Sequence, residues 1–235
     1  MNNTAERIIK ELKKCENKKF IESEKHFFKE PIKTHGLTSQ ETKEVAKRYF
    51  EEIKNLSLPQ IFVIAEKLLK TGYNQEIFIV FNWLYRLQKK YSKQHFVIFE
   101  KWLKKHIANW ATNDDFSTHA LGYFLFTFPE FLPKVKQWAK AKNRWVKRSS
   151  ATSLIYSLRR KKYFKELLAV SETLLTDTDL MVQKGYGWAL KEATEHYPKE
   201  VLAFVMKHKK IMPRTALRYA IEKLSPAQKK LAMKK

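Results

Sequence analysis

An all-α fold is predicted by three features of the sequence. Apolar residues recur at helical spacing along most of the chain, capping residues or prolines precede many of these runs, and glycine is scarce. The 235 residues include only 5 Gly and 7 Pro, too few for the many tight turns of a β-sandwich. With 44% hydrophobic and 14% aromatic residues, the chain is expected to form a globular core rather than to be disordered.

In the first half of the chain, start signals and apolar spacing predict six helices. Thr38-Ser39-Gln40-Glu41 is a capping box, and Ser57, Asn74 and Ser92 are expected to cap the helices that follow them. Pro31 ends the second helix. The expected ranges are 4–14, 22–29, 38–54, 57–72, 74–91 and 92–107.

In the second half, prolines mark several helix starts, because proline fits the first turn of a helix. Pro129 and Pro133 open the helix at 131–142, and Pro198 and Pro213 open two others. Asn143 is expected to cap the helix at 144–160, and the Asp177–Asp179 segment to open the one at 180–195. The remaining expected helices are 116–128, 131–142, 163–175, 198–208, 213–224 and a short basic helix after Ser225-Pro226.

The helices follow one another in pairs at a period of roughly 35 to 45 residues. Antiparallel pairs at this period indicate a HEAT- or armadillo-like α-solenoid, with a globular helical bundle as the alternative. We expect a solenoid curved around a basic concave groove. Since no linker is rich in Gly, Ser or Pro, a single domain is expected over residues 1–235.

The chain is strongly basic, with 47 Lys and Arg residues against 24 Asp and Glu residues and a net charge of +23. Such an excess indicates a polyanionic partner: DNA, RNA or acidic lipid. From Phe131 to Lys165 there is no acidic residue, whereas aromatic rings such as Trp145 and Tyr163 alternate with the cations. Nucleic acid is favoured over a membrane surface, because no helix combines this charge with a bare apolar face. The alternative to a nucleic-acid surface is that these aromatic rings belong to the core and that the lysines are simply solvated.

Other classes are disfavoured by the sequence. The longest apolar run, Leu121–Phe128, is too short to cross a bilayer, and the N-terminus has no signal-peptide core. The single cysteine, Cys15, excludes an intramolecular disulfide and an all-cysteine zinc site. No H-E-x-x-H motif, glycine-rich phosphate loop or G-x-S-x-G elbow is present. We therefore expect a cytoplasmic protein without cofactor or metal, and no membrane partner.

Two stretches carry unusual combinations of residues. In the first, residues 109–116, Trp110 and Asp114 are four positions apart and would share a helix face, which suits stabilisation of a cation. Taken alone, this stretch is better explained by Trp110 as a core ring and by Asn113 or Asp114 as the cap of the next helix. In the second, residues 183–192, Gly185 and Gly187 flank Tyr186 inside a helix. Tight helix packing explains this stretch as well as a site does.

These stretches resemble one family. Trp110-Ala111-Thr112-Asn113-Asp114 with Leu121-Gly122, Asn143 to Arg148, Gln183 to Trp188 and Met212 to Ile221 are similar, in order and spacing, to the AlkD-type DNA alkylation repair enzymes. These are DNA glycosylases of HEAT-like repeats, and the resemblance spans about residues 20–224. It implies metal-independent excision of cationic N3- and N7-alkylated purines from double-stranded DNA by a monomer with no obligate protein partner, in a bacterial cytoplasm and near the nucleoid.

The resemblance also implies roles for individual residues. Asp114 corresponds to the catalytic aspartate, Trp110 and Trp188 to the two site tryptophans, and Arg148 to an arginine that contacts the backbone phosphate. The further residues expected to bind DNA are Lys147, Arg144, Lys191 and Arg214.

Chemistry supports excision without a general acid, because an alkylated purine already carries a positive charge. The sugar passes through an oxocarbenium-like state that the Asp114 carboxylate can stabilise while it orients water. The chain departs from the family at Phe27 and Thr38. Because Asp115 directly follows Asp114, the sequence leaves open which of the two is the catalytic aspartate. The alternatives are a non-catalytic binder of branched or damaged DNA and, from another class, a protein-binding adaptor.

Overall fold

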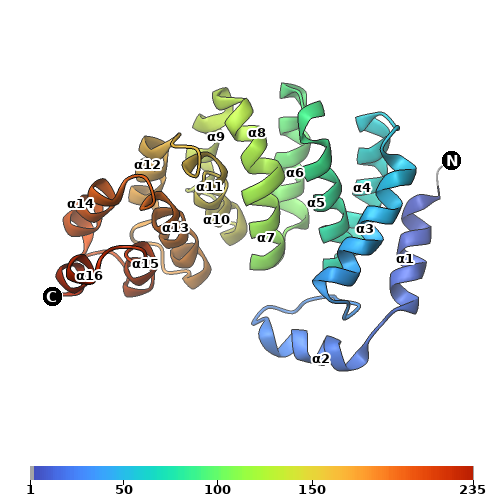
Figure 1. Cartoon of the computed structure of the whole chain (residues 1–235), viewed down its shortest axis with the longest axis horizontal. Helices are drawn as coiled ribbons and strands as arrows, with labels where there is room; N and C mark the ends of the chain where they lie inside the picture. The colour runs from blue at the N-terminus through green and yellow to red at the C-terminus, as the bar shows by residue number, and fades with distance from the viewer. Residues whose placement is uncertain (1–2, 235) are drawn as a thin grey trace. The chain divides into compact units, whose positions relative to one another are not determined.

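The computed structural model describes residues 3–234, and in this range it contains helices and no β-strand (Figure 1). This confirms the all-α prediction. None of the described helices is long and apolar enough to span a membrane. The α-helices are α1 (Thr4–Lys14), α2 (Lys18–Phe27), α3 (Ser39–Ile53), α4 (Leu58–Thr71), α5 (Asn74–Leu87), α6 (Phe96–His106), α7 (Trp110–Phe116), α8 (Gly122–Thr127), α9 (Leu132–Trp138), α10 (Arg144–Thr152), α11 (Ile155–Leu158), α12 (Phe164–Leu174), α13 (Leu180–Ala193), α14 (Pro198–His208), α15 (Arg214–Ala220) and α16 (Pro226–Met233).

The chain divides into two units that are described separately. Unit 1 consists of residues 1–92 and 105–115, and unit 2 of residues 93–104 and 116–235. The prediction of a single domain over residues 1–235 and that of a basic concave groove both stay predictions.

A repeat of about 35 residues organises the helices. The first residues of α5, α7, α10, α13 and α15 follow one another at 36, 34, 36 and 34 residues. In unit 1, Asn109 at the start of α7 donates to Asn74 at the start of α5, and in unit 2 Arg144 at the start of α10 pairs with Asp179 before α13. Equivalent positions of successive repeats thus contact each other, as expected for stacked helix pairs.

The core of unit 1 lies between α1, α3, α4 and α5. Ile8, Leu12, Ile53 and Leu68 are completely buried there, and the Trp83 indole donates a hydrogen bond of 2.8 Å to the Ala46 carbonyl. Burial of large apolar side chains accounts for most of the stability of such a core. The helices α3, α4 and α5 lie side by side in Figure 1.

In unit 2, α13 is the central helix and packs against α10 on one side and α15 on the other. Two glycines allow this close packing. A Cβ on Gly185 would lie 2.8 Å from Cγ of Arg148 on α10, and one on Gly187 would lie 2.8 Å from the Ala216 carbonyl of α15. The packing interpretation of these glycines is therefore sound, whether or not a site lies beside them.

Most predicted helix starts are confirmed. Thr38 and Ser225 form capping boxes, and the side chains of Asn143 and Asp179 accept hydrogen bonds from the first turns of α10 and α13. Asn74 is wrong as a cap, because it is the first residue of α5 and Tyr73 precedes the helix.

The helix predicted over 144–160 is also wrong, because two helices, α10 and α11, occupy this range. The hydroxyls of Ser150 and Thr152 donate to carbonyls one turn earlier, at 2.6 and 3.2 Å. Such bonds weaken and bend a helix.

Candidate functional site

Trp110 lies in an aromatic cluster of unit 1. Phe28, at the end of α2, stacks on the indole with ring centroids 5.4 Å apart and an interplanar angle of 24°. Phe27 meets it edge-on at 5.7 Å and is itself 68% exposed. Trp110 is half-buried, which argues against the alternative that it serves only as a core ring. The α2 segment holds one face of the indole.

Asn109 fixes the start of α7. Its side-chain oxygen accepts a hydrogen bond of 3.0 Å from the Thr112 amide, and its amide group donates to Asn74 at 2.9 Å. The cap therefore precedes Trp110, and the prediction that Asn113 or Asp114 caps a later helix is wrong. Both lie inside α7, which passes without interruption into a π-helical turn, η3 (Ser117–Leu121), and then into α8.

The burial pattern of α7 separates two faces. Thr112 and Asn113 are completely buried, whereas Trp110, Asp114 and Asp115 are half-buried. Asp114 is four residues after Trp110, so the carboxylate and the indole share one side of the helix. A π-helical turn follows within three residues, and such turns are frequent at functional sites.

In unit 2, Arg148 packs into the protein. Its side chain is only 5% exposed, lies across Gly185 and donates to the Met181 carbonyl of α13. A direct phosphate contact by Arg148 therefore requires this side chain to turn outwards. Its predicted role in DNA binding stays a prediction.

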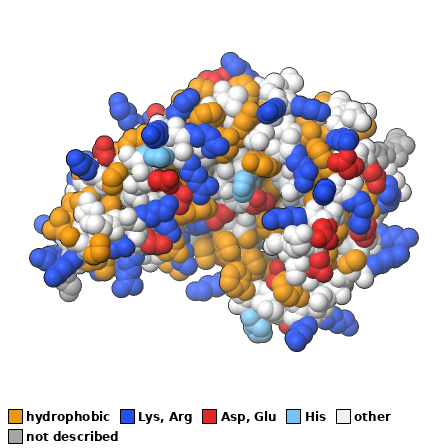
Figure 2. Space-filling view, viewed as in Figure 1, with side chains coloured by type: hydrophobic (Ala, Val, Ile, Leu, Met, Phe, Trp, Pro, Cys, Tyr) orange, Lys and Arg blue, Asp and Glu red, His pale blue; other side chains and the backbone are white. Residues whose placement is uncertain are grey.

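The other predicted DNA-binding residues are mostly paired with carboxylates. Lys147 contacts Asp177 at 2.5 Å, Arg144 contacts Asp179 at 2.8 Å, and Lys191 contacts Glu222 at 2.5 Å. Arg214, the first residue of α15, is exposed. Within residues 131–165, Arg144, Lys147 and Arg159 thus pair with acids from later in the chain. On the face drawn in Figure 2, acidic side chains lie among the Lys and Arg side chains.

Trp188 lies half-buried on α13, directly after Gly187. Its neighbour Tyr186 is completely buried, and this burial, together with the Asp177 charge, raises the pKa of the Tyr186 hydroxyl. Tyr186 is therefore neutral and serves the core. The part of Trp188 in a reaction stays a prediction.

A buried ionic network near the start of α5 was not predicted. His35 is 3% exposed and lies between two carboxylates, with Nδ1 at 3.0 Å from Glu16 and Nε2 at 2.9 Å from Glu76. The ring also stacks on Tyr73 with centroids 4.3 Å apart. Burial lowers the pKa of His35, but the hydrogen bonds and charges of Glu76 and Glu16 raise it by more. The histidine thus links the loop after α2 to the first turn of α5.

Within residues 3–234, no cluster of three or more His, Cys, Asp or Glu side chains has the arrangement of a metal site. The chemistry available near α7 consists of one indole, two adjacent carboxylates and the flanking phenyl rings. An indole face attracts cations, and a fixed carboxylate stabilises positive charge. This part of unit 1 is suited to a cationic ligand.

A model of the family described as DNA alkylation repair enzyme matches residues 8–224. The chain belongs to this family. The match crosses both units and includes Trp110, Asp114, Arg148 and Trp188. No curated protein sequence matches the chain.

Solved structures share the fold of this DNA alkylation repair family member. A predicted DNA alkylation repair enzyme from Enterococcus faecalis is 16% identical with a TM-score of 0.81, over 90% of this chain and 97% of that one. The smu.31 protein of Streptococcus mutans is 18% identical with a TM-score of 0.58, over 79% and 94%.

The third structure is the alkylpurine DNA glycosylase AlkC of Pseudomonas fluorescens, bound to DNA containing an abasic site analogue. It is 15% identical with a TM-score of 0.55, over 98% of this chain and 66% of that one. At these identities, the three similarities establish the fold and not the residue roles.

Proposed function

We propose that the protein is a DNA glycosylase that excises cationic N3- and N7-alkylated purines from duplex DNA. The observation that carries this proposal is the placement of Trp110 and Asp114 one helical turn apart on the half-buried side of α7. The family membership of the chain supports this proposal. The similarity to AlkC, which is named as a glycosylase and is bound to DNA, also supports it.

The reaction needs little from the protein beyond electrostatics. The glycosidic bond breaks with both electrons going to the purine, which is already cationic and leaves as a neutral base. The sugar then carries the positive charge, and the Asp114 carboxylate stabilises it and orients the water that attacks the anomeric carbon. The attacking water releases a proton to solvent in this step, and the sugar keeps the hydroxyl group.

The indole of Trp110 would contribute before bond cleavage. A cation over its face gains about 0.5–2 kcal/mol, depending on desolvation. Since Phe28 covers one face of the ring, the alkylated base would use the other face. Once the bond breaks and the base becomes neutral, this attraction disappears, which favours release of the product.

DNA binding would rest on the basic surface, whose contacts with phosphate position the duplex without reading its sequence. The ion pairs of Lys147, Arg144 and Lys191 lower the net charge that these residues present. Phosphates would compete with Asp177, Asp179 and Glu222 for the same cations, so binding is expected to depend strongly on salt.

Incubation of the full chain with methylated duplex DNA, with and without EDTA, tests the proposal. We expect free 7-methylguanine or 3-methyladenine to appear, with abasic DNA as the second product, at the same rate in both buffers. Tight and salt-sensitive binding without base release would instead indicate a DNA-structure binder on the same fold.

A further inference from the structure

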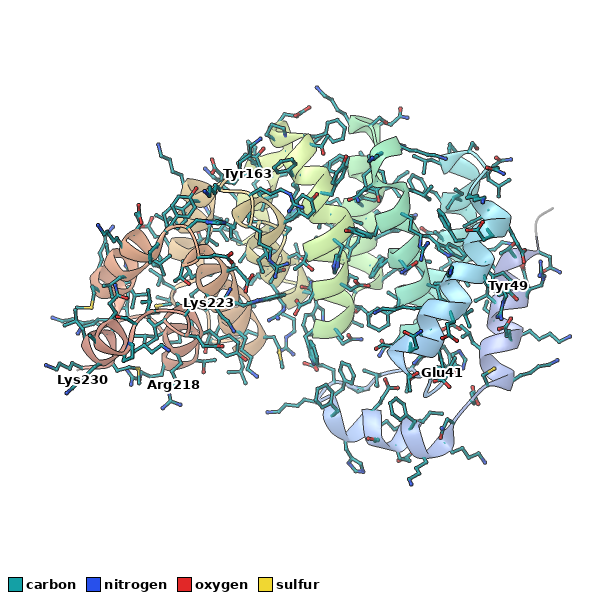
Figure 3. The ribbon with its side chains drawn as sticks, viewed as in Figure 1. Glu41, Tyr49, Tyr163, Arg218, Lys223 and Lys230 are labelled. Carbon is teal, nitrogen blue, oxygen red and sulfur yellow. The ribbon has the colours of Figure 1, made fainter. Side chains whose placement is uncertain are left out.

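A turn of four consecutive cations lies at one end of unit 2. Arg159, Arg160, Lys161 and Lys162 connect the end of α11 to Tyr163, which precedes α12, and all four side chains are exposed. Tyr163 marks this turn in Figure 3, where it lies above Lys223, Arg218 and Lys230.

The backbone of the turn is held in an unusual conformation. Lys161 and Tyr163 have φ angles of 59° and 63°, and they are the non-glycine residues with positive φ in the described part of the chain. L-residues rarely adopt this region, and such conformations persist where the surroundings impose them. Here the Tyr163 hydroxyl donates to the Phe126 carbonyl at 3.3 Å, and the Tyr197 hydroxyl donates to the Lys161 carbonyl at 2.9 Å. The turn is therefore fixed from both sides.

Aromatic rings, and not carboxylates, hold two of the cations. The Arg160 guanidinium lies 3.6 Å from the centroid of the Tyr156 ring and donates to the Tyr156 carbonyl at 2.8 Å. The Lys162 ammonium lies 4.5 Å from the centroid of the Phe126 ring. A cation–π contact orients a cation without cancelling its charge. These contacts thus order both side chains without neutralising them.

The contrast with the neighbouring arginine is informative. Arg159 pairs with Glu192 at 2.8 Å, in the same way that Arg144 and Lys147 pair with acids. Within residues 3–234, no carboxylate lies within ion-pair distance of Arg160, Lys161 or Lys162. The turn therefore presents three uncompensated charges on a rigid support.

The turn belongs to the basic segment 131–165, but it is separate from Arg144 and Lys147, the residues of that segment expected to bind DNA near Arg148. Arg144 pairs with Asp179 at the N-terminal end of α13, and Arg159 pairs with Glu192 near its C-terminal end. Glu192 lies thirteen positions after Asp179, which corresponds to about 20 Å along the helix. Phosphates bound by the turn would differ from those near Arg148.

We propose that Arg160, Lys161 and Lys162 form a second phosphate-binding surface of unit 2, which binds the backbone of duplex DNA at phosphates other than those near Arg144 and Lys147. This inference takes its DNA partner from the proposed function. Acidic lipid fits less well, because residues 155–166 contain none of the exposed large apolar side chains that would enter a bilayer. A pre-ordered cluster loses little side-chain freedom on binding, which suits sequence-independent contact.

Duplex binding at different salt concentrations tests this surface. The triple variant Arg160→Gln/Lys161→Gln/Lys162→Gln is compared with Lys10→Gln/Lys13→Gln/Lys14→Gln, which removes the same charge from exposed positions of α1. The probe is an unmodified fluorescent 30-base-pair duplex. The plot of log affinity against log salt should become less steep in the turn variant. The magnitude of its slope should decrease by about 2 to 3, because each lost phosphate contact removes roughly 0.9. It should change by less than about 1 in the α1 variant.

A second variant guards against misfolding of the turn. Lys161→Gly with Lys162→Gln keeps Arg160 on its ring and places at position 161 a residue that favours positive φ. The magnitude of its slope should decrease by about 2. The proposal would be overturned if the turn and α1 variants had equal slopes, or if the turn variant kept the wild-type slope. It would also be overturned if the turn variant bound vesicles of acidic lipid more weakly than the wild type but bound the duplex equally well. Undamaged DNA reports binding alone, so failed base release by the wild-type protein would contradict the proposed function and not this surface.

Discussion

The ring of Phe28 stacks on the indole of Trp110, with centroids 5.4 Å apart and an interplanar angle of 24°. One residue ends α2 and the other begins α7, so a helix early in the chain sets the orientation of a ring near its middle. Phe28 is buried, whereas Phe27 is 68% exposed beside the same indole. The account of the site therefore depends on α2 as well as on α7.

Replacing Phe28 with leucine should slow base release roughly tenfold, because the volume is kept while the ring that holds Trp110 is lost. The pair of rings contributes about 0.5–1.5 kcal/mol, and the free energy of unfolding should fall by a similar amount. Single-turnover base release and urea unfolding measure the two effects. Phe20→Leu on the same helix is the control, and an equal loss of rate in both variants would argue against a role for the Phe28 ring.

Asn109→Ala should lower the free energy of unfolding by about 1–3 kcal/mol, because it removes the cap of α7 and leaves the buried side-chain oxygen of Asn74 without this donor. A double-mutant cycle with Asn74→Ala isolates the contact between the two side chains, and the two effects should not add. Additive losses would show that the Asn74–Asn109 bond does not stabilise the start of α7.

The two glycines of α13 should respond differently to alanine. Gly187→Ala places a methyl group 2.8 Å from a carbonyl and from a Cβ of α15, which cannot move alone, and overpacking should cost about 1–3 kcal/mol. Gly185→Ala meets the Arg148 side chain, which can shift, so stability should change less. Urea unfolding of both variants tests this order. The reverse order would mean that α10 is held more rigidly than α15.

His35 should make stability depend on pH. Its pKa is raised in the folded protein, so the folded state binds the proton more tightly than the unfolded state does. The stabilisation is complete below the unfolded pKa of about 6.5 and is lost as the pH rises through the folded pKa. The difference in unfolding free energy between the wild type and His35→Gln should therefore shrink from pH 5.5 to about pH 9. A constant difference over this range would contradict the charged state of His35.

Local signals made much of the fold predictable. The capping boxes of Thr38 and Ser225 and the caps of Asn143 and Asp179 each act within three residues, so the sequence shows them directly. The sequence does not single out Asn109 as the cap of α7, because further polar residues that also cap helices follow it. Burial of Thr112 and Asn113 decides between these possibilities, and burial is a property of the fold.

The residues that surround the site are harder to predict from the sequence, because their contacts also depend on the fold. Trp110 and Asp114 share a face through helical spacing alone, but Phe28 reaches Trp110 only through the path of α2. The ion pairs of Lys147 and Arg144 join residues about one repeat apart, so a basic segment read by itself looked uncompensated. Contacts at this separation require knowledge of which helices are neighbours.

Base release by Asp114→Asn and Asp115→Asn, measured side by side on duplex DNA containing 7-methylguanine, tests the central claim most directly. Both substitutions remove one negative charge from adjacent half-buried positions of α7. We expect Asp114→Asn to lower the single-turnover rate by at least about a hundredfold with DNA binding intact, and Asp115→Asn to change it less than about threefold. Full activity of Asp114→Asn would contradict the proposed role of this carboxylate.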